Sequence, residues 1–463
     1  MDADLRSIAQ ARAAVEDAHT AFQKFHGTDQ ESIDRIVEAM VRAIEPECAR
    51  LGEMAAEETQ HGNAQDKLYK NLFNALGVWE WLRNVRTVGI LWKDDATNVM
   101  AIGEPMGVVA ALIPVTNPTS TVIFKVLSAV KAGNAIVCAH HPRGVKSGGE
   151  TARILAAAAE AAGAPQGLIQ TLDEVTIEGT AELMRHRRTS VVMATGGTAM
   201  VRAAYSSGKP TLAVGPGNVP VYVDGTARAE LPDIADAILT SKAFDYGTAC
   251  VAEQAVIADR AIAGPLRNEM KLAGGYFCTP RESDALARVI FGEQLNYIAQ
   301  NVGQPAARLA ELAGFDVPPR TRVLLSDQTD VGRSVPLSAE KLNPVLAFYE
   351  VADSNAGYQR AEEILRFGGV GHTSALWAND PDVVAQFSHL PAGRILVNTP
   401  CLFGGMGYSV DIEPSFMLGT GTWSGSIVSD NVTALHLINI KRVAYESRPW
   451  RSLYDAFNPG ANS

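Results

Sequence analysis

The chain has few cysteines, no long apolar run and no excess of positive charge across its 463 residues. Its five cysteines are widely spaced and form no C-x-x-C pair, so neither a zinc site nor a disulfide framework is indicated. The longest apolar run, 107–115, is shorter than the ~18 residues of a membrane span. The 40 Lys and Arg residues against 51 Asp and Glu give a net charge of −11, which does not suggest a nucleic-acid partner.

The composition is that of an ordinary globular protein, with 47% hydrophobic residues. At this length two domains are the natural expectation. The N-terminus, MDADLRSIAQ, is charged and helix-forming, and it lacks the apolar segment of a secretion signal. Unpaired cysteines suit a reducing compartment, so we expect a cytoplasmic protein without a membrane partner and without a metal.

The pattern of apolar runs predicts two α/β domains. The first ninety residues are expected to be helical, and four short apolar runs then alternate with helix-like stretches: 107–114, 135–139, 190–195 and 211–215. Fully apolar strands between helices imply a parallel sheet covered on both faces. A second series of strands follows at 253–259, 322–327, 344–351, 374–379 and 394–400. We therefore predict domains at 1–227 and 228–425, and a tail, 426–463, that packs on the first domain or on a neighbouring subunit.

The loops that follow the first series of strands are rich in glycine, proline, asparagine and histidine: IPVTNPTS, HHPRG, ATGGTAM and GPGNVP. Parallel sheets bind ligands at the carboxyl ends of their strands. ATGGTAM has the bare backbone that seats a phosphate at a helix start, although a tight strand-to-helix turn explains it equally well. The predicted nucleotide-binding residues are Pro114, Thr116, His140, Pro142, Arg143, Thr195, Gly196, Gly197 and Gly215.

Eight collinear stretches together resemble the CoA-acylating branch of the aldehyde dehydrogenase superfamily. They are EPMGVVAALIPVTNPTSTVIFK, GNAIVCAHHPR, ATGGTAMVRAAYSSGKP, FDYGTACVAEQ, EKLNPVLA, GGVGHTSALW, RILVNTP and HLINIKR. The branch includes the aldehyde half of bifunctional aldehyde–alcohol dehydrogenases, microcompartment propionaldehyde dehydrogenases and acylating sulfoacetaldehyde dehydrogenases. The resemblance implies an aldehyde dehydrogenase-like α/β fold, with two three-layer α/β domains and a small oligomerisation element.

The resemblance also assigns roles to four residues. Cys250 matches the catalytic thiol, which attacks the aldehyde carbon and leaves an enzyme thioester after oxidation. Asn117 matches the asparagine that stabilises the tetrahedral oxygen, and His372 matches a histidine near the cysteine. Glu340 matches the glutamate that bonds the nicotinamide ribose. Each residue also has a purely structural interpretation. Cys250 is then a small core residue and Asn117 part of an Asn-Pro turn. His372 is then a structural histidine in a glycine-rich loop, and Glu340 a surface residue.

One absence favours transfer to coenzyme A over hydrolysis. Hydrolytic relatives carry a glutamate that activates water, and the matching stretch here has no carboxylate between Tyr205 and Asp224. The thioester then persists until a thiol such as CoA attacks it. The loop after the second strand, HHPRG, has no acidic residue to repel a ribose 2′-phosphate, so both NAD and NADP are open.

The expected function is the reversible oxidation of a small aldehyde to its acyl-CoA with reduction of NAD(P). The stretch 401–426 should line the aldehyde pocket and contains no Lys or Arg, yet neutral and sulfonated aldehydes both stay open. We also expect a homodimer or homotetramer, and an association with a bacterial microcompartment shell is open, with 448–457 as a docking helix or an exposed tail. The alternatives are a hydrolytic aldehyde dehydrogenase and a non-catalytic scaffold.

Overall fold

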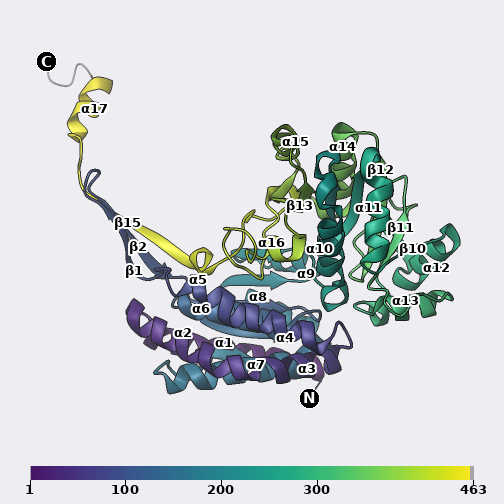
Figure 1. Ribbon diagram of the computed structural model, residues 1–463. Coiled ribbons are helices and arrows are strands. Elements are labelled where there is room, and N and C mark those ends of the chain that lie inside the picture. Colours follow the sequence, from purple (N-terminus) through teal and green to yellow (C-terminus); the bar gives the residue numbers. More distant parts are fainter. Residues whose placement is uncertain (1, 459–463) are drawn as a thin grey trace.

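The computed structural model describes residues 2–458, which form two α/β domains and a projecting arm (Figure 1). The first domain is built on a parallel sheet of five strands in the order β5-β4-β3-β6-β7. Its strands are β3 (Val108–Ile113), β4 (Ala135–His140), β5 (Ile169–Thr171), β6 (Thr189–Thr195) and β7 (Thr211–Val214). β3 and β4 are buried along their whole length, as expected for strands of a sheet with both faces covered.

The helices of this domain pack around that sheet, and their apolar residues form one continuous core with it. Helix α2 shows the local logic: Asp29 caps its first turn by accepting a hydrogen bond from the Ser32 amide, and its apolar residues recur every three or four positions on the buried side. The helices are α1 (Ala3–Phe25), α2 (Gln30–Ile44), α3 (Cys48–Thr59), α4 (Ala64–Leu72), α5 (Val78–Leu82), α6 (Pro118–Lys131), α7 (Val145–Ala161), α8 (Ile177–Arg185) and α9 (Thr198–Tyr205).

The second domain holds a parallel sheet of seven strands in the order β10-β11-β12-β9-β8-β13-β14. The strands are β8 (Val219–Val223), β9 (Glu253–Asp259), β10 (Gly275–Cys278), β11 (Val323–Asp327), β12 (Val345–Val351), β13 (Gly371–Trp377) and β14 (Ala392–Val397). The helices are α10 (Leu231–Ala243), α11 (Arg260–Leu272), α12 (Pro280–Ile290), α13 (Ala306–Ala313), α14 (Ser354–Ile364), α15 (Pro381–Phe387) and α16 (Cys401–Gly405).

The change of sheet comes earlier than the predicted boundary at 227/228. Strand β7 ends the first sheet, and β8 pairs with β9 and β13 in the second. The chain therefore crosses between the sheets at residues 215–218. The apolar pattern of 211–223 hid the crossing because Pro220, which cannot donate a ladder hydrogen bond, argues against a central strand.

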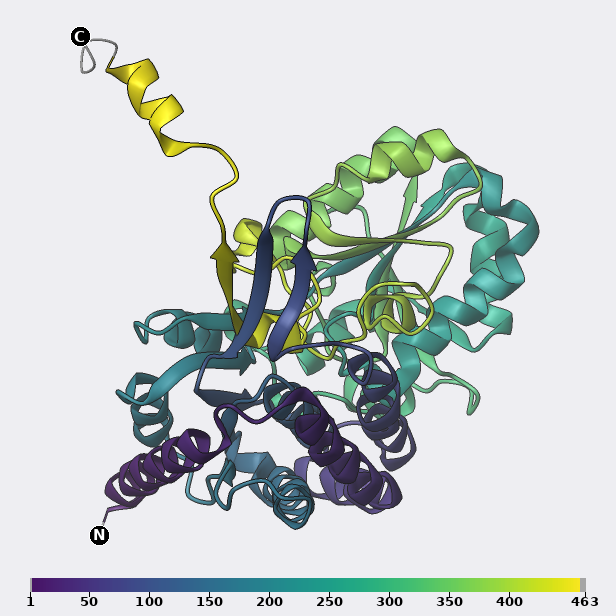
Figure 2. The same ribbon diagram turned by 90° about the vertical axis from the view of Figure 1, so that its left-hand side faces the viewer.

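Three antiparallel strands form the arm: β1 (Gly89–Asp94), β2 (Val99–Pro105) and β15 (Ile438–Ala444). Figure 2 shows the arm beside the two domains, with α17 (Trp450–Phe457) beyond its end. The predicted tail thus pairs, through β15, with β2 of the predicted first domain. No local apolar pattern indicates β1 and β2, because their side chains are largely exposed or half-buried.

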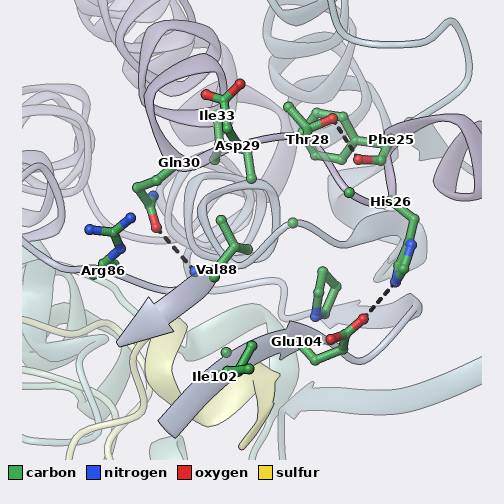
Figure 3. Close-up of a pocket in the computed structure, with 15 residues that line it drawn as sticks. Phe25, His26, Thr28, Asp29, Gln30, Ile33, Arg86, Val88, Ile102 and Glu104 are labelled. Atoms are coloured by element: carbon green, nitrogen blue, oxygen red, sulfur yellow. Dashed lines mark hydrogen bonds and ion pairs between the residues drawn. The ribbon is translucent and has the colours of Figure 1, made fainter. Parts of the chain in front are cut away.

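A cavity of about 280 Å³ lies where this arm meets the first domain (Figure 3). At one side the ring of His26 bonds the Glu104 carboxylate at 2.8 Å, and at another Gln30 accepts hydrogen bonds from the backbone amides of Thr87 and Val88. None of the predicted site residues lines it. Within residues 2–458, no helix is long and apolar enough to cross a membrane, and no three His, Cys, Asp or Glu side chains are grouped to hold a metal ion.

Candidate active site

The topology of the second sheet brings Cys250, His372 and Glu340 to one end of its strands. Strands β12, β9, β8 and β13 are neighbours and run parallel, so the segments that precede them lie side by side. Those segments carry Glu340, Cys250 and Gly217, and His372 is the second residue of β13. Gly217 lies in the linker between the two sheets, residues 215–218, and it packs closely against both Cys250 and His372. A Cβ on Gly217 would lie 2.2 Å from the Cys250 carbonyl oxygen and 3.2 Å from Cδ2 of His372.

A turn with left-handed backbone conformation precedes Cys250 at this end of the sheet. Asp245, Tyr246 and Gly247 follow α10 with φ of 48°, 51° and 73°, and two of them are non-glycine residues in a conformation that costs free energy. Gly247 packs so tightly that a Cβ would lie 2.6 Å from the carbonyl carbon of Asn343. The backbone is thus held firmly three residues before Cys250.

Cys250 is half-buried, whereas the other four cysteines are buried. Burial raises the pKa of its thiol to about 12, and the charge of Glu340 raises it further, while Arg394 and Lys70 act in the opposite sense. The thiol is therefore neutral at rest, and it needs a base before it can act as a nucleophile. Its exposure, rather than its pKa, distinguishes it from the buried cysteines.

His372 lies inside strand β13 and is fully buried, which corrects the expectation of a glycine-rich loop. The glycines around it serve close packing: a Cβ on Gly371 would lie 1.7 Å from the Thr420 carbonyl oxygen. Its Nδ1 bonds the Thr373 hydroxyl at 3.0 Å, and no partner for Nε2 exists among residues 2–458. Burial, with Arg394 nearby, lowers the pKa of His372 to about 3, so the imidazole is neutral.

Glu340 is buried and already hydrogen-bonded, rather than a surface residue. Its Oε1 accepts from the Gly217 amide at 3.0 Å and its Oε2 from the Tyr297 hydroxyl at 2.9 Å. Burial raises its pKa to about 7 despite these bonds. A ribose at this position would have to share or replace one of the two partners.

Asn117 lies at the carboxyl end of β3, immediately before Pro118 opens helix α6. Its side-chain oxygen accepts a hydrogen bond of 2.7 Å from Lys70 on α4. Lys70 also contacts Asp245 at 2.5 Å and the Thr248 hydroxyl at 3.1 Å. The amide of Asn117 and the loop that carries Cys250 are therefore joined through one buried ammonium group.

The other predicted nucleotide residues lie at the carboxyl edge of the first sheet. Its strand order reverses between β3 and β6, and this switch point is where such sheets bind ligands. Pro114 and Thr116 follow β3, while Thr195, Gly196 and Gly197 follow β6, and Gly215 follows β7. Three features fit a nucleotide: within the described range 2–458, the Thr195 hydroxyl is buried without a hydrogen-bond partner, and the Cβ positions of Gly197 and Gly215 face open space.

The loop after β4 fits the prediction less well. His140 is buried, its Nε2 bonds the Thr171 hydroxyl at 2.7 Å, and its ring packs against Gly148, so its side chain is not available to a ligand. Pro142 is exposed. Arg143 is half-buried and points its guanidinium to the Thr59 carbonyl at 2.5 Å.

The sequence alone missed four buried charged residues around the site: Lys67, Lys70, Asp245 and Arg394. Arg394 on β14 donates to the His372 carbonyl and the Thr373 hydroxyl, both at 3.1 Å. For the two lysines a signal did exist. Polar residues of α4 and the turn after it, 67, 70, 71 and 74, recur at the spacing of a buried helix face, where apolar residues are normal.

Comparison with known proteins identifies the family. The model of the aldehyde dehydrogenase family matches residues 2–273. The bifunctional aldehyde-alcohol dehydrogenase of Escherichia coli is 39% identical over 96% of this chain and 51% of its own length. The acylating sulfoacetaldehyde dehydrogenase of Cupriavidus necator is 36% identical over 95% of this chain and 90% of its own. The chain belongs to the aldehyde dehydrogenase family, and it spans about half the length of its bifunctional relatives.

Solved structures of acylating aldehyde dehydrogenases share the fold of this chain. An acetylating aldehyde dehydrogenase from Geobacillus thermoglucosidasius is 45% identical, covers 96% of this chain and 98% of its own, and superposes with a TM-score of 0.94. A Rhodopseudomonas palustris propionaldehyde dehydrogenase with bound propionyl-CoA, 26% identical, covers 94% of both chains with a TM-score of 0.85. An engineered glycolyl-CoA reductase with bound NADP+ is 25% identical, covers 94% and 96%, and has a TM-score of 0.84. The predicted resemblance to the acylating branch and the predicted fold are confirmed.

Proposed function

We propose that this chain oxidises a small aldehyde to its acyl-CoA with reduction of NAD(P), through a thioester on Cys250. One observation supports the proposal: the backbone carbonyl of the half-buried Cys250 and the ring of His372 both lie against Gly217. Lys70 in turn joins the side chain of Asn117 to Thr248, two residues before Cys250. A thiol, a neutral imidazole and an amide donor are the groups that addition of sulfur to a carbonyl requires.

In the first half-reaction, Nε2 of His372 accepts the thiol proton while the sulfur of Cys250 forms a bond to the aldehyde carbon. The carbonyl oxygen becomes an oxyanion, which the amide of Asn117 stabilises by donating a hydrogen bond. A bound nicotinamide cofactor supplies the acceptor for the hydride that leaves the former aldehyde carbon, and Pro114, Thr116, Thr195, Gly196, Gly197 and Gly215 would hold it. The product of this half-reaction is a thioester on Cys250. His372 then releases its proton to solvent.

In the second half-reaction, the thiol of CoA gives up its proton to His372 as its sulfur attacks the thioester carbon, the bond to Cys250 breaks, and the leaving cysteine sulfur takes up that proton. Hydrolysis would need a free carboxylate to activate water. Glu340 is the acidic residue that affects the pKa of Cys250, and both of its oxygens already accept hydrogen bonds. The linker 215–218 contributes no carboxylate. The thioester therefore outlasts contact with water until CoA arrives.

The surroundings of Cys250 favour a neutral aldehyde. The residues on either side of the thiol, Ala249 and Val251, belong to an apolar cluster with four partly buried phenylalanines: Phe73, Phe244, Phe403 and Phe416. The two cations that influence the thiol, Lys70 and Arg394, are buried in hydrogen bonds to the protein. We propose a short neutral aldehyde as the substrate, because no free cation is left to pair with a sulfonate or carboxylate at this place among residues 2–458.

A panel of aldehydes tests these proposals. Acetaldehyde and propionaldehyde should reduce the cofactor with steady turnover only when CoA is present, and mass spectrometry should find the acyl-CoA. Sulfoacetaldehyde and succinate semialdehyde should give much lower kcat/KM. Cys250→Ala should abolish turnover, while Cys278→Ala, at a buried cysteine outside the site, is the matched control. Steady turnover to free acid without CoA would select hydrolysis instead.

We propose self-association through the arm, as a homodimer or homotetramer. Apolar side chains on β1, on β15 and just after β15 are exposed: Ile90, Trp92, Ile440, Val443 and Tyr445. Exposed apolar patches of this kind mark protein contact surfaces. Light scattering on the full chain and on a Trp92→Glu, Ile440→Glu variant tests this, because the charged variant should be monomeric.

We further propose that the protein works in the reducing interior of the cell, where its five free cysteines are stable. Association with a microcompartment shell stays a prediction. Its candidate segment is α17, which exposes Trp450, Leu453, Tyr454 and Phe457 on one side. Co-sedimentation with purified shells, with Leu453→Glu as the control, tests it.

A further inference from the structure

Helix α4 turns two lysines into the protein interior, and only one of them contacts a predicted catalytic side chain. Lys67 and Lys70 are each 2% exposed and both contact the buried carboxylate of Asp245, at 3.0 Å and 2.5 Å. Lys67 also donates a hydrogen bond of 2.9 Å to the backbone carbonyl of Thr116. Lys70 instead donates to the side-chain oxygen of Asn117 at 2.7 Å.

This contact determines which way the Asn117 amide faces. An ammonium group has three protons and no acceptor, so the amide atom that faces Lys70 is the oxygen. The Nδ2 group must then point to the opposite side. It donates one proton to the Thr116 hydroxyl at 3.1 Å, and among residues 2–458 the second proton has no acceptor. That proton is the one free to meet a substrate oxygen.

The same ammonium group also binds the segment before the nucleophile. Its third contact is the Thr248 hydroxyl, 3.1 Å away and two residues before Cys250. Its positive charge counteracts the rise in the pKa of the Cys250 thiol that burial causes. Lys70 thus links the amide donor and the sulfur loop.

We propose that Lys70 is a positioning residue for the reaction: it holds the Asn117 amide with Nδ2 toward the oxygen of an aldehyde bound at Cys250. This inference rests on the proposed function, because it assigns Lys70 a role only if Asn117 stabilises an oxyanion. Lys67 provides the matched comparison. It lies one turn away, is equally buried and shares Asp245, but it does not contact the Asn117 side chain.

A double-mutant cycle on the full chain tests the proposal. The readout is the rate of the burst of reduced cofactor with propionaldehyde and no CoA, normalised to the titrated Cys250 thiol. We expect Asn117→Ala to slow the burst about 100-fold or more and Lys70→Met to slow it about 10- to 100-fold, with the aldehyde KM changed by less than about threefold. In the Asn117→Ala background, Lys70→Met should cost less than about threefold, because its target is gone.

Lys67→Met should slow the burst by the same factor in both backgrounds. Full multiplication of the Lys70→Met and Asn117→Ala effects would overturn the proposal, and so would a Lys67→Met effect that also disappears with Asn117. These results differ from failure of the proposed function, which would appear as no burst in the unmodified protein with any aldehyde.

If Lys70→Met does not fold, a second variant, Asn117→Asp, tests whether Lys70 faces residue 117. Asn117→Asp places a carboxylate against the Lys70 ammonium group and removes the amide donor. It should abolish the burst and melt at a higher temperature than Asn117→Ala, because the new ion pair forms only if Lys70 faces residue 117. A melting temperature equal to or below that of Asn117→Ala would overturn the proposal.

Discussion

The phenol of Tyr297 lies 2.9 Å from the Glu340 carboxylate and 3.1 Å from the backbone carbonyl of the same residue. Burial raises the pKa of Tyr297 well above its usual value, so it remains a hydrogen-bond donor at all moderate pH values. The second carboxylate oxygen accepts from the Gly217 amide. Through these hydrogen bonds Glu340 connects Gly217, in the linker between the two sheets, with Tyr297 of the second domain.

The raised pKa of Glu340 predicts a pH-dependent stability. Its folded pKa is about 7 against an ordinary value of 4.5, so the folded state binds the proton more tightly than the unfolded state does. That contribution to stability is complete below 4.5 and is lost as the pH rises through 7, on the order of 3 kcal/mol. Urea unfolding of the unmodified protein and of Glu340→Gln, between about pH 5 and about pH 8, measures it.

The unmodified protein should lose stability relative to Glu340→Gln over that range. Glu31→Gln, at a surface position, is the control and should show no such difference. A Glu340→Gln curve parallel to that of the unmodified protein would mean that the carboxylate titrates normally.

Gly217 should tolerate no side chain. A Cβ there would lie 2.2 Å from the Cys250 carbonyl oxygen and 3.2 Å from the His372 ring, and both neighbours belong to the site. Gly217→Ala should lower the melting temperature and slow the cofactor burst by about 100-fold, because a displacement of about 1 Å misaligns the reacting groups. Gly215→Ala is the matched variant, since its Cβ faces open space.

Gly215→Ala should keep the melting temperature and raise the KM for the nicotinamide cofactor, because Gly215 lies at the nucleotide edge. Equal losses of stability in the two variants would show that the linker, rather than the contact with Cys250 and His372, sets the requirement for glycine.

The strands that are buried on both faces were predictable from the sequence. The apolar run 107–114 became β3 (Val108–Ile113), and 135–139 became β4 (Ala135–His140). The arm was not predictable, because β1 and β2 are stabilised by pairing with β15 from the far end of the chain rather than by a local apolar pattern. Strand β8 was hidden by Pro220, which the sheet accommodates with a shift in register.

The candidate site likewise contains residues that could be predicted from the sequence and residues that could not. The roles of Cys250, Asn117 and Glu340 are predictions from the resemblance of their motifs, and the segments of Cys250 and Glu340 precede neighbouring strands of the second sheet. The network of Lys67, Lys70 and Asp245 was not predicted, because it joins residues that are more than 170 positions apart in the sequence. Local patterns report on helices and strands, whereas contacts of this kind depend on how the two domains meet.

Asp245 should be essential for stability. It is the carboxylate between two buried lysines. Burial acts to raise the pKa of Asp245, but the charges of Lys67 and Lys70 together lower it below its usual value. Asp245→Asn leaves both ammonium groups without their ion pair, and breaking a buried pair in this way costs about 3–5 kcal/mol. Asp236→Asn, which removes an exposed ion pair with Arg322, is the control and should cost less than about 1 kcal/mol.

The sign of the pH effect follows from the lowered pKa. The stabilisation by Asp245 is present above the pKa of the unfolded carboxyl group and is lost as the pH falls through the folded value. The difference in urea midpoint between the unmodified protein and Asp245→Asn should therefore shrink in acid. A constant difference over the whole acid range would contradict the ion-pair account.

The thiol of Cys250 should react slowly at neutral pH and faster as the pH rises. Its pKa of about 12 means that the reactive thiolate increases about tenfold for each pH unit across the range from about pH 7 to about pH 9. Labelling with iodoacetamide, located by peptide mass spectrometry, measures this rate. The other four cysteines are buried and should stay unlabelled in the folded protein, and Cys250→Ala should remove the label altogether. A rate that levels off near neutral pH would show that Lys70 and Arg394 outweigh the effect of burial, so that the resting thiol is already ionised and His372 is not needed as its base.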